Sequence, residues 1–261
     1  MPNEAIEVKN VTIQFDSLKA NNDVSFSVHE GEVFGLIGPN GAGKTTLFNA
    51  MTGSLVPTSG EILFEGKSVL RKRPDEICHM DISRTYQNIR LFSQLSVIEN
   101  VEIALHSTPC YSRLAAFLGL PVVKRVERET REEAKKLLQR FDLQDQAEKK
   151  AGSLPYAMQR KLEIARALAT KPRFLLLDEP AAGMNNDECN ELVALLRSIH
   201  EEFQLTTVII EHHMDLVSKL CDRLCVLNLG EVLMVDLPSA VQSDPRVIAA
   251  YLGNRRQKNN E

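Results

Sequence analysis

Residues 38–46 of this 261-residue chain read GPNGAGKTT, and their types and spacing could bind phosphate. Gly38, Gly43, Lys44 and Thr45 meet the pattern G-x-x-x-x-G-K-[ST]. Glycines let successive backbone N–H groups approach an anion at the start of a helix. Lys44 adds a mobile cation for the β- and γ-phosphates of a nucleotide, and the Thr45 hydroxyl could ligate Mg²⁺. The structural alternative is a glycine-rich turn that binds nothing. The other members of this loop are Pro39, Asn40, Gly41, Ala42 and Thr46.

Residues 173–179 read RFLLLDE, an apolar run that ends in two acidic residues. An uninterrupted apolar run is typical of a strand buried on both faces of a parallel sheet. Acids at the C-terminal end of such a strand lie where open α/β sheets bind ligands. Of Asp178 and Glu179, one could hold Mg²⁺ through water and the next could take a proton from an attacking water. The alternative is a charged exit from strand to loop.

Three further side chains could act with these groups, and each also has an ordinary structural explanation. Gln87 follows a predicted strand end and could reach a metal or an attacking water, or it could be a solvated loop residue. His212 ends another strand and could hydrogen-bond a γ-phosphate, or it could be an ordinary satisfied histidine. Phe15 could stack on a nucleotide base or could fill the core.

The residues that could do chemistry require an α/β framework. Apolar alternation predicts an antiparallel pair of strands, with turn-forming residues 21–23 between them. The predicted strands cover residues 6–15, 24–28, 33–37, 61–64, 173–179, 206–210, 223–228 and 231–236. Helices are predicted after the phosphate loop, from about Gln159, after a capping box at Asn185 and Glu188, and over residues 245–252.

Residues 97–141 have a different pattern, which predicts an inserted helical subdomain. Residues 97–105 are helical in pattern, and residues 114–120 form an apolar patch. From Val122 the chain predicts a charged amphipathic helix. We therefore expect one domain over residues 1–253. Its core would comprise residues 1–87 and 159–253, its helical subdomain residues 88–158, and its disordered polar tail residues 254–261.

Composition excludes several classes of protein. The net charge is −4, from 31 basic and 35 acidic residues, which gives no general attraction to nucleic acid or anionic lipid. No apolar run approaches the ~20 residues needed to span a bilayer, and the N-terminal residues do not form a secretory signal. Five scattered cysteines indicate reduced thiols in a cytoplasmic protein. Cys221 and Cys225 could be metal ligands, but buried small apolar residues are the simpler interpretation.

In order and spacing, these motifs resemble an ATP-binding cassette (ABC) ATPase across almost the whole chain. Residues 38–46 resemble the Walker A loop, and residues 175–179 resemble Walker B with its following glutamate. Gln87 falls at the Q-loop, residues 181–185 at the D-loop, and His212 at the switch histidine. The resemblance implies a P-loop NTPase (RecA-like) core with an antiparallel β subdomain and an inserted α-helical subdomain.

The same resemblance implies a mechanism in which two such domains sandwich two ATP molecules. Each ATP would lie between the Walker A loop of one subunit and the signature of the other. Lys44 and the loop amides would hold the phosphates, and Phe15 would stack on adenine. Glu179 would polarise the attacking water, and His212 would brace the γ-phosphate. Mg²⁺ would be arranged by Thr45, Gln87 and Asp178.

Within this family the chain resembles the larger ATP-binding subunit of branched-chain amino acid importers. The stretches that carry this resemblance are RTYQNIRLF, RKLEIARALATKP, LLLDEPAAGMN, IIEHHMDLV and DPRVIAAYLG. It implies a peripheral protein at the cytoplasmic face of the inner membrane. Its partners would be a second ABC ATPase, in a heterodimer or alternatively a homodimer, two integral membrane permeases and, indirectly, an external solute-binding protein. Leu91 and Phe92 could face a permease helix or could be subdomain core.

Residues 154–158, LPYAM, depart from the LSGGQ or LSYGQ signature expected of this family. Pro155 lacks a hydroxyl and an N–H, and Ala157 and Met158 crowd a site of close approach. We therefore expect the ATP site closed by this signature to hydrolyse ATP slowly or only to bind it. Three alternatives remain: an ABC ATPase for another cargo such as lipid or lipopolysaccharide, a nucleotide-binding structural partner with little hydrolysis, and a soluble phosphotransferase, for which no acceptor motif is seen.

Overall fold

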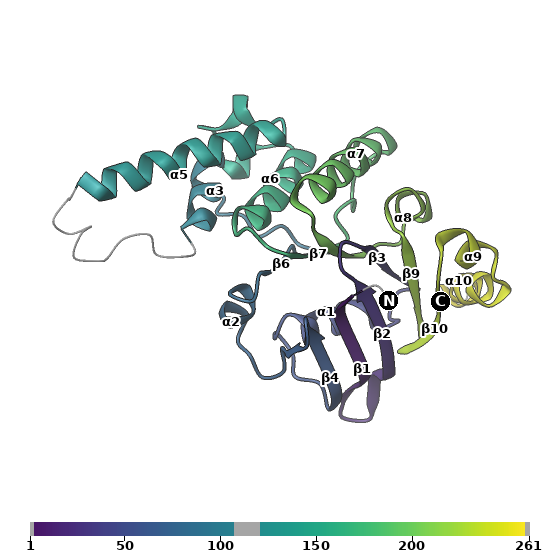
Figure 1. Cartoon of the computed structure of the whole chain (residues 1–261). Coiled ribbons are helices and arrows are strands. Elements are labelled where there is room, and N and C mark those ends of the chain that lie inside the picture. The colour runs from purple at the N-terminus through teal and green to yellow at the C-terminus, as the bar shows by residue number, and fades with distance from the viewer. Residues whose placement is uncertain (1–2, 107–120, 259–261) are drawn as a thin grey trace. The chain divides into compact units, whose positions relative to one another are not determined.

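The computed structural model describes residues 3–106 and 121–258, with side chains described up to residue 252. The chain divides into two compact units, one formed by Met1–Arg84 with Arg173–Glu261 and the other by Thr85–Pro172 (Figure 1). Each unit is described by itself. The predicted apolar patch at residues 114–120 lies outside the described residues.

The first unit contains a six-stranded sheet in the order β10-β9-β3-β8-β7-β6. Its strands are β3 (Val33–Ile37), β6 (Ile82–Arg84), β7 (Phe174–Asp178), β8 (Thr206–Ile210), β9 (Arg223–Asn228) and β10 (Glu231–Asp236). Neighbouring strands are parallel except for β10, which pairs with β9 as an antiparallel hairpin. Every residue of β3, β7 and β8 is buried, which confirms the interpretation of these apolar runs as central strands.

A four-stranded antiparallel sheet in the same unit has the order β2-β1-β4-β5. Its strands are β1 (Glu4–Phe15), β2 (Leu18–His29), β4 (Ser59–Phe64) and β5 (Lys67–Ser68). The turn predicted at residues 21–23 is wrong, because these residues lie inside β2 and the hairpin turns at residues 16–17. Asn21 is fully buried and Asp23 takes a φ of 53°, so the polar residues mark register irregularities within the strand.

The helices of the first unit complete the α/β arrangement. They are α1 (Lys44–Met51), α2 (Pro74–Cys78), α7 (Asn186–Phe203), α8 (Met214–Leu220), α9 (Pro238–Ser243) and α10 (Pro245–Lys258). The capping box predicted at Asn185 is present, since its side chain accepts from the backbone of residues 187 and 188 and the Glu188 carboxylate returns to its N–H. Helix α10 continues to Lys258, beyond the predicted end at residue 252.

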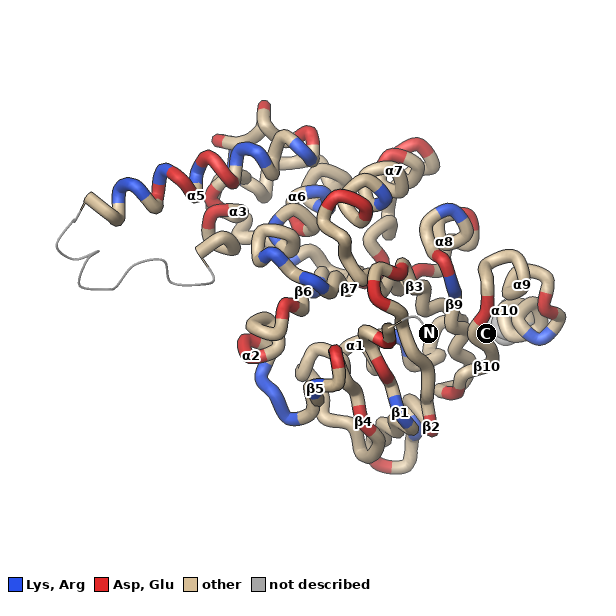
Figure 2. The backbone as a smooth tube through the Cα atoms, in the orientation of Figure 1, with Lys and Arg blue, Asp and Glu red and all other residues tan. Residues whose placement is uncertain are grey.

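The second unit is helical, as predicted. It contains α3 (Val97–Leu105), α5 (Pro121–Arg140) and α6 (Tyr156–Ala169), with 3-10 turns at Gln144–Gln146 and Ala151–Ser153. Helix α5 buries Val123, Thr130, Ala134 and Leu138, and Figure 2 shows Lys, Arg, Asp and Glu along the rest of it. Helix α6 begins at Tyr156, earlier than the predicted Gln159, because Pro155 takes an extended ψ of 150° and serves as the N-cap. No helix among the described residues is long and apolar enough to cross a bilayer.

Two cysteines of the first unit, Cys221 and Cys225, are small buried side chains. Cys221 and Cys225 are 7% and 0% exposed, and burial raises the pKa of both thiols. Neither belongs to a cluster of metal-ligating groups in the part of the chain that the structure describes. The interpretation as buried apolar residues is confirmed for this pair.

Candidate nucleotide-binding site

The loop between β3 and α1 has the conformation that its glycines permit. Gly38 and Gly43 take φ values of 149° and 95°. A Cβ at Gly38 would lie 2.1 Å from the carbonyl oxygen of Leu227, and one at Gly43 would lie 2.3 Å from that of Ala20. Both contacts are too short for any side chain, so these glycines are required by the fold of the loop.

The start of α1 provides partial positive charge from backbone N–H groups that no side chain caps. Gly43 is the N-cap, no side chain caps the helix, and its first turn holds no acidic residue. The first N–H groups of a helix have no intrahelical acceptor, and the helix dipole favours an anion there. Thr45, at the second helical position, is exposed.

Lys44 lies along the loop, with its ammonium group hydrogen-bonded to backbone oxygens. Its Nζ donates to Gly38 O at 2.7 Å and to Pro39 O at 2.9 Å, and the residue is 7% exposed. Burial lowers the pKa of Lys44, while the negative charges of Glu179 and Asp178 oppose that shift. The lysine and the two acids therefore act on one another in a single site.

Sheet topology explains why these residues meet. The parallel strands β3, β8 and β7 are neighbours, and their C-terminal ends lead into the phosphate loop, into Glu211 and into Glu179 respectively. The backbone N–H of Glu179 donates to Ile210 O at 2.9 Å, which ties the end of β7 to the end of β8. The carboxyl edge of a parallel sheet is where α/β proteins bind ligands.

Arg84, which the sequence reading did not single out, organises the acid at the end of β7. Its Nη2 contacts Asp178 Oδ2 at 2.7 Å, and the two side chains are 5% and 1% exposed. Its Nη1 donates to Asn49 Oδ1 at 2.8 Å and to Thr52 Oγ1 at 3.0 Å, at the end of α1. Its guanidinium carbon also lies 5.5 Å from the centre of the Phe48 ring. One buried arginine thus fixes Asp178 relative to the helix that follows the phosphate loop.

Glu179 is partly buried and takes a φ of 48°, in the left-handed region. A residue other than glycine in this region is strained by about 1–3 kcal/mol. The backbone turns sharply at Glu179, so this residue no longer follows the direction of β7, whose last residue is Asp178.

His212 lies beyond the end of β8, and its neighbour Glu211 holds the loop in place. Glu211 is fully buried, and its two carboxylate oxygens accept from Ala181 N at 2.9 Å and from His212 N at 3.1 Å. The His212 side chain is 47% exposed, and its Nδ1 lies 4.0 Å from Glu211 Oε2. The predicted contact of this imidazole with a γ-phosphate remains a prediction.

Phe15 is the last residue of β1 and pairs with Leu18 across the hairpin. Its exposed fraction is 48%, so the alternative of a core phenylalanine is wrong. An aromatic face open to solvent is available for stacking, and that role remains a prediction.

Gln87 belongs to the second unit, together with the residues that hold its backbone. The buried Arg160 of α6 donates to Tyr86 O at 2.6 Å and also to Gln87 O, and it pairs with Glu163 at 2.8 Å. The metal and catalytic roles predicted for Gln87 remain predictions.

Residues 154–158, in the second unit, begin α6 without a hydrogen-bonding side chain at the cap. Pro155 is the N-cap and makes no side-chain cap. The Gln159 amide instead donates to Leu154 O at 2.8 Å, and Tyr156 is 45% exposed. The start of this helix therefore has a proline ring at position 155, where the signature would place a serine hydroxyl.

The residues present fit a nucleoside triphosphate. The loop leaves no room for a Cβ at Gly38 or Gly43, the first turn of α1 is uncapped by side chains, and Lys44 already donates to the oxygens of its own loop. The exposed Thr45 hydroxyl and the Asp178 carboxylate are oxygen donors of the kind that Mg²⁺ prefers.

Two protein families match this chain. The family described as ABC transporter matches residues 21–182. The family described as Branched-chain amino acid ATP-binding cassette transporter matches residues 231–256, which include β10 and most of α10.

Curated relatives match over nearly the whole chain. The high-affinity branched-chain amino acid transport ATP-binding protein BraF of Pseudomonas aeruginosa is 41% identical over 253 residues, 97% of this chain and 99% of that protein. LivG of Escherichia coli, described in the same words, is 38% identical with the same coverage. A probable LivG of Methanocaldococcus jannaschii is 33% identical over 96% of this chain and 98% of its own length.

Solved structures of ABC transporter cassettes also resemble this chain. The ADP conformation of MJ1267, an ATP-binding cassette of an ABC transporter, superposes with a TM-score of 0.83 at 33% identity, covering 96% of this chain and 99% of that one. The dimeric structure of MJ0796, a bacterial ABC transporter cassette, gives a TM-score of 0.76 at 26% identity, with coverage of 89% and 98%.

Proposed function

The chain belongs to the ABC transporter family of ATP-binding proteins, and we propose that it powers the import of leucine, isoleucine and valine. It is an ABC ATPase, and its relatives BraF and LivG carry branched-chain amino acid transport in their names. The match of residues 231–256 to a branched-chain amino acid cassette family supports the same cargo.

The observation that carries the ATPase function is the meeting of the phosphate loop with two acids at one sheet edge. Lys44 and the first N–H groups of α1 would bind the β- and γ-phosphates, and the exposed ring of Phe15 would stack on adenine. Mg²⁺, when bound with ATP, supplies charge neutralisation at the phosphates. Thr45, Asp178 and Gln87 are the residues that would hold it.

Glu179 is the group that would accept a proton from the attacking water. His212 would donate a hydrogen bond to the γ-phosphate from the loop that Glu211 anchors. A positioned base contributes about 10²–10⁴-fold to rate, so Glu179→Gln should reduce hydrolysis by that factor and leave ATP binding intact. Hydrolysis at the wild-type rate in Glu179→Gln would remove this residue from the mechanism.

ABC ATPases of this kind act as dimers on membrane permeases. We propose a heterodimer with a second ABC ATPase at the cytoplasmic face of the inner membrane, together with two permease subunits and an external binding protein. Phe92, which is 50% exposed on the second unit, and its neighbour Leu91 are candidates for the surface that receives a permease helix. A charge at Leu91 should abolish permease binding and spare ATP binding, whereas normal assembly would refute this placement.

The uncapped start of α6 supports an asymmetric pair of ATP sites. In this proposal the Walker A site of this chain hydrolyses ATP against a partner's signature, and the site closed by residues 154–158 is slow. Loss of one donor to transition-state charge reduces rate by roughly 10²–10³-fold. Pro155→Ser combined with Ala157→Gly should therefore raise turnover of the assembled complex, and unchanged turnover would count against asymmetry.

The same observation favours a second candidate, a nucleotide-binding partner whose ATP mainly holds the complex together. The Glu179→Gln variant separates the two, because a structural partner would lose no turnover when its glutamate is replaced. Transport assays with leucine, isoleucine, valine and a lipid substrate test the cargo, since the cargo alternative predicts response to the lipid alone.

A further inference from the structure

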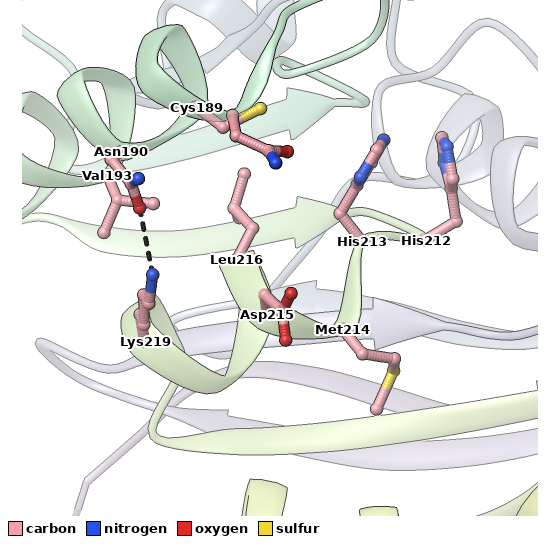
Figure 3. A pocket seen from close by; sticks show the side chains of 10 residues that line it. Cys189, Asn190, Val193, His212, His213, Met214, Asp215, Leu216 and Lys219 are labelled. Atoms are coloured by element: carbon pink, nitrogen blue, oxygen red, sulfur yellow. Dashed lines mark hydrogen bonds between the residues drawn. The ribbon is translucent and has the colours of Figure 1, made fainter.

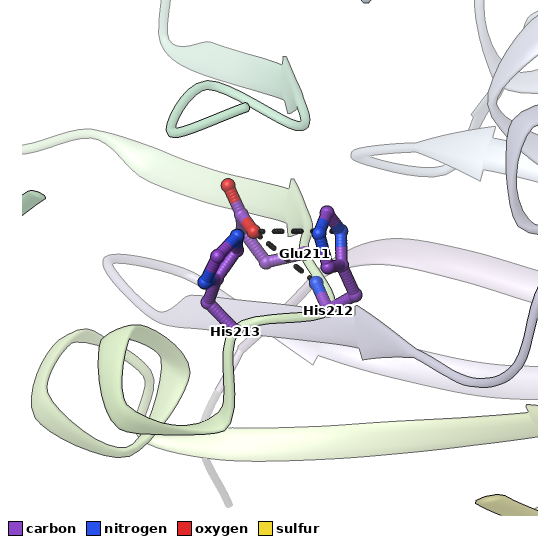
Figure 4. Close-up of side chains that lie close together, drawn as sticks. All are labelled: Glu211, His212 and His213. Carbon is purple, nitrogen blue, oxygen red and sulfur yellow. Dashed lines mark hydrogen bonds and ion pairs between the residues drawn. The ribbon is translucent and has the colours of Figure 1, made fainter. Parts of the chain in front are cut away.

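Three consecutive residues after β8 bring metal-ligating groups together. The ligand atoms of Glu211, His212 and His213 all lie within 4.8 Å of one another (Figure 4). The two imidazole rings have centroids 4.4 Å apart and are tilted by 42°. We propose that this cluster binds a transition-metal ion such as Zn²⁺, with one carboxylate oxygen and two ring nitrogens as ligands.

Glu211 is the fixed ligand of the cluster. Its side chain is fully buried, and each carboxylate oxygen accepts one backbone hydrogen bond, from Ala181 N and from His212 N. A carboxylate has about four acceptor positions, so each oxygen keeps one for a metal. Among the described residues, the basic group within ion-pair distance is the His212 imidazole, whose Nδ1 lies 4.0 Å away. A divalent cation would offset the cost of this buried charge more fully.

The two histidine ligands determine which metal ions the cluster can bind. Two imidazoles with one carboxylate suit Zn²⁺, Co²⁺ or Ni²⁺, whereas Mg²⁺ and Ca²⁺ prefer oxygen ligands. Tetrahedral ligands about 2.0–2.1 Å from Zn²⁺ are roughly 3.3 Å apart, so the cluster must tighten around the ion. Because both imidazoles are exposed while Glu211 is held by the backbone, the rings can turn toward the carboxylate.

A cavity lies beside the two histidines of the cluster. Its volume is about 450 Å³, and its wall includes His212, His213, Cys189 and Asp215 (Figure 3). Lys219 on the same wall donates to Asn190 Oδ1 at 2.9 Å. Water in this space could complete the coordination of the ion.

Metal binding would compete with the role proposed for His212, and this consequence rests on the proposed function. An imidazole that Zn²⁺ holds beside Glu211 would no longer be free to turn toward a γ-phosphate. Zn²⁺ should therefore inhibit ATP hydrolysis while the phosphate loop still binds nucleotide.

The binding test uses the full-length chain without an affinity tag, freed of metal and without nucleotide. Zn²⁺ affinity is measured by competition with a chromophoric chelator, and Co²⁺ is used as a spectroscopic probe. We expect one Zn²⁺ per chain, an affinity at least tenfold weaker in His213→Gln, and loss of the visible Co²⁺ absorption in that variant. Cys189→Ser is the matched control, because this thiol lines the cavity but is not part of the cluster. Equal affinities in wild type and His213→Gln, or loss of binding in Cys189→Ser, would overturn the proposed site.

The activity test uses the chain assembled with its partners, excess Mg·ATP and buffered free Zn²⁺. His213→Gln should require at least tenfold more Zn²⁺ for half-inhibition than wild type. Zinc that binds to the cluster without inhibiting hydrolysis would overturn the coupling to His212. Hydrolysis in zinc-free buffer is a separate readout, so failure of the ATPase function itself is distinguished from failure of the metal site.

Discussion

The buried pair formed by Arg84 and Asp178 predicts a large and specific loss of stability in Arg84→Met. The change keeps the apolar stem and removes the guanidinium, which contacts Asp178 at 2.7 Å and also serves Asn49 and Thr52. Removing one partner of a buried ion pair costs about 3–5 kcal/mol, because the remaining carboxylate is still buried. With both side chains at most 5% exposed, solvent screening does not reduce this figure.

Denaturant unfolding and thermal unfolding measure this loss. For a chain of this size, about 2–4 °C of melting temperature corresponds to each kcal/mol, so the midpoint should fall by roughly 6–20 °C. Arg173→Met is the matched control, since Arg173 is half exposed and pairs with Glu65 at the surface. An exposed pair contributes about 0–1 kcal/mol, so the control should unfold close to the wild type.

A double-mutant cycle tests the cause of the loss. Asp178→Asn removes the charge that Arg84 neutralises, so the double variant Arg84→Met with Asp178→Asn should be less destabilised than the sum of the single variants. Coupling of about 0.5–3 kcal/mol is typical of contacting residues. Additive effects, or a loss in Arg84→Met no larger than in Arg173→Met, would refute the reasoning.

Three further predictions concern the phosphate loop and the helix after β7. Burial lowers the pKa of Lys44, and a bound phosphate favours the charged form of this lysine. Nucleotide affinity should therefore fall as the pH rises, and the fall should begin at a lower pH than for an ordinary lysine, whose pKa is ~10.4. Calorimetric titration with ADP at several pH values checks this, and an affinity that does not change with pH would contradict it. Gly38→Ala should abolish ADP binding, since its Cβ would lie 2.1 Å from Leu227 O; retained binding in an equilibrium assay would contradict this. Asn185→Ala should lower the free energy of unfolding by about 1 kcal/mol through loss of the capping box, and urea denaturation that shows no change would disprove that contribution.

The sequence alone was enough to predict the elements whose residue pattern is compatible with a single kind of structure. The apolar runs of β3, β7 and β8 are buried on both faces, as expected of central parallel strands. The glycine spacing of residues 38–46 leaves little choice of conformation. For the same reason, the sequence pattern alone predicts a phosphate-binding loop at these residues.

Other features depend on contacts that a local pattern does not contain. Asn21 has turn chemistry, but it is buried inside β2, where tertiary burial overrides local preference. Arg84 lies 94 residues from Asp178, so no local spacing links them. Glu211 looks like an ordinary strand-end acid until its hydrogen bond to Ala181 is seen. Each of these roles arises from proximity of distant segments.

The central claim is best tested by isolating the chain with its partners from native membranes in mild detergent. We expect a second ABC ATPase and two membrane permeases in the purified complex. We also expect ATP hydrolysis to rise when a binding protein loaded with leucine, isoleucine or valine is added. A complex that lacks these partners, or hydrolysis that ignores all three amino acids while responding to another cargo, would contradict it.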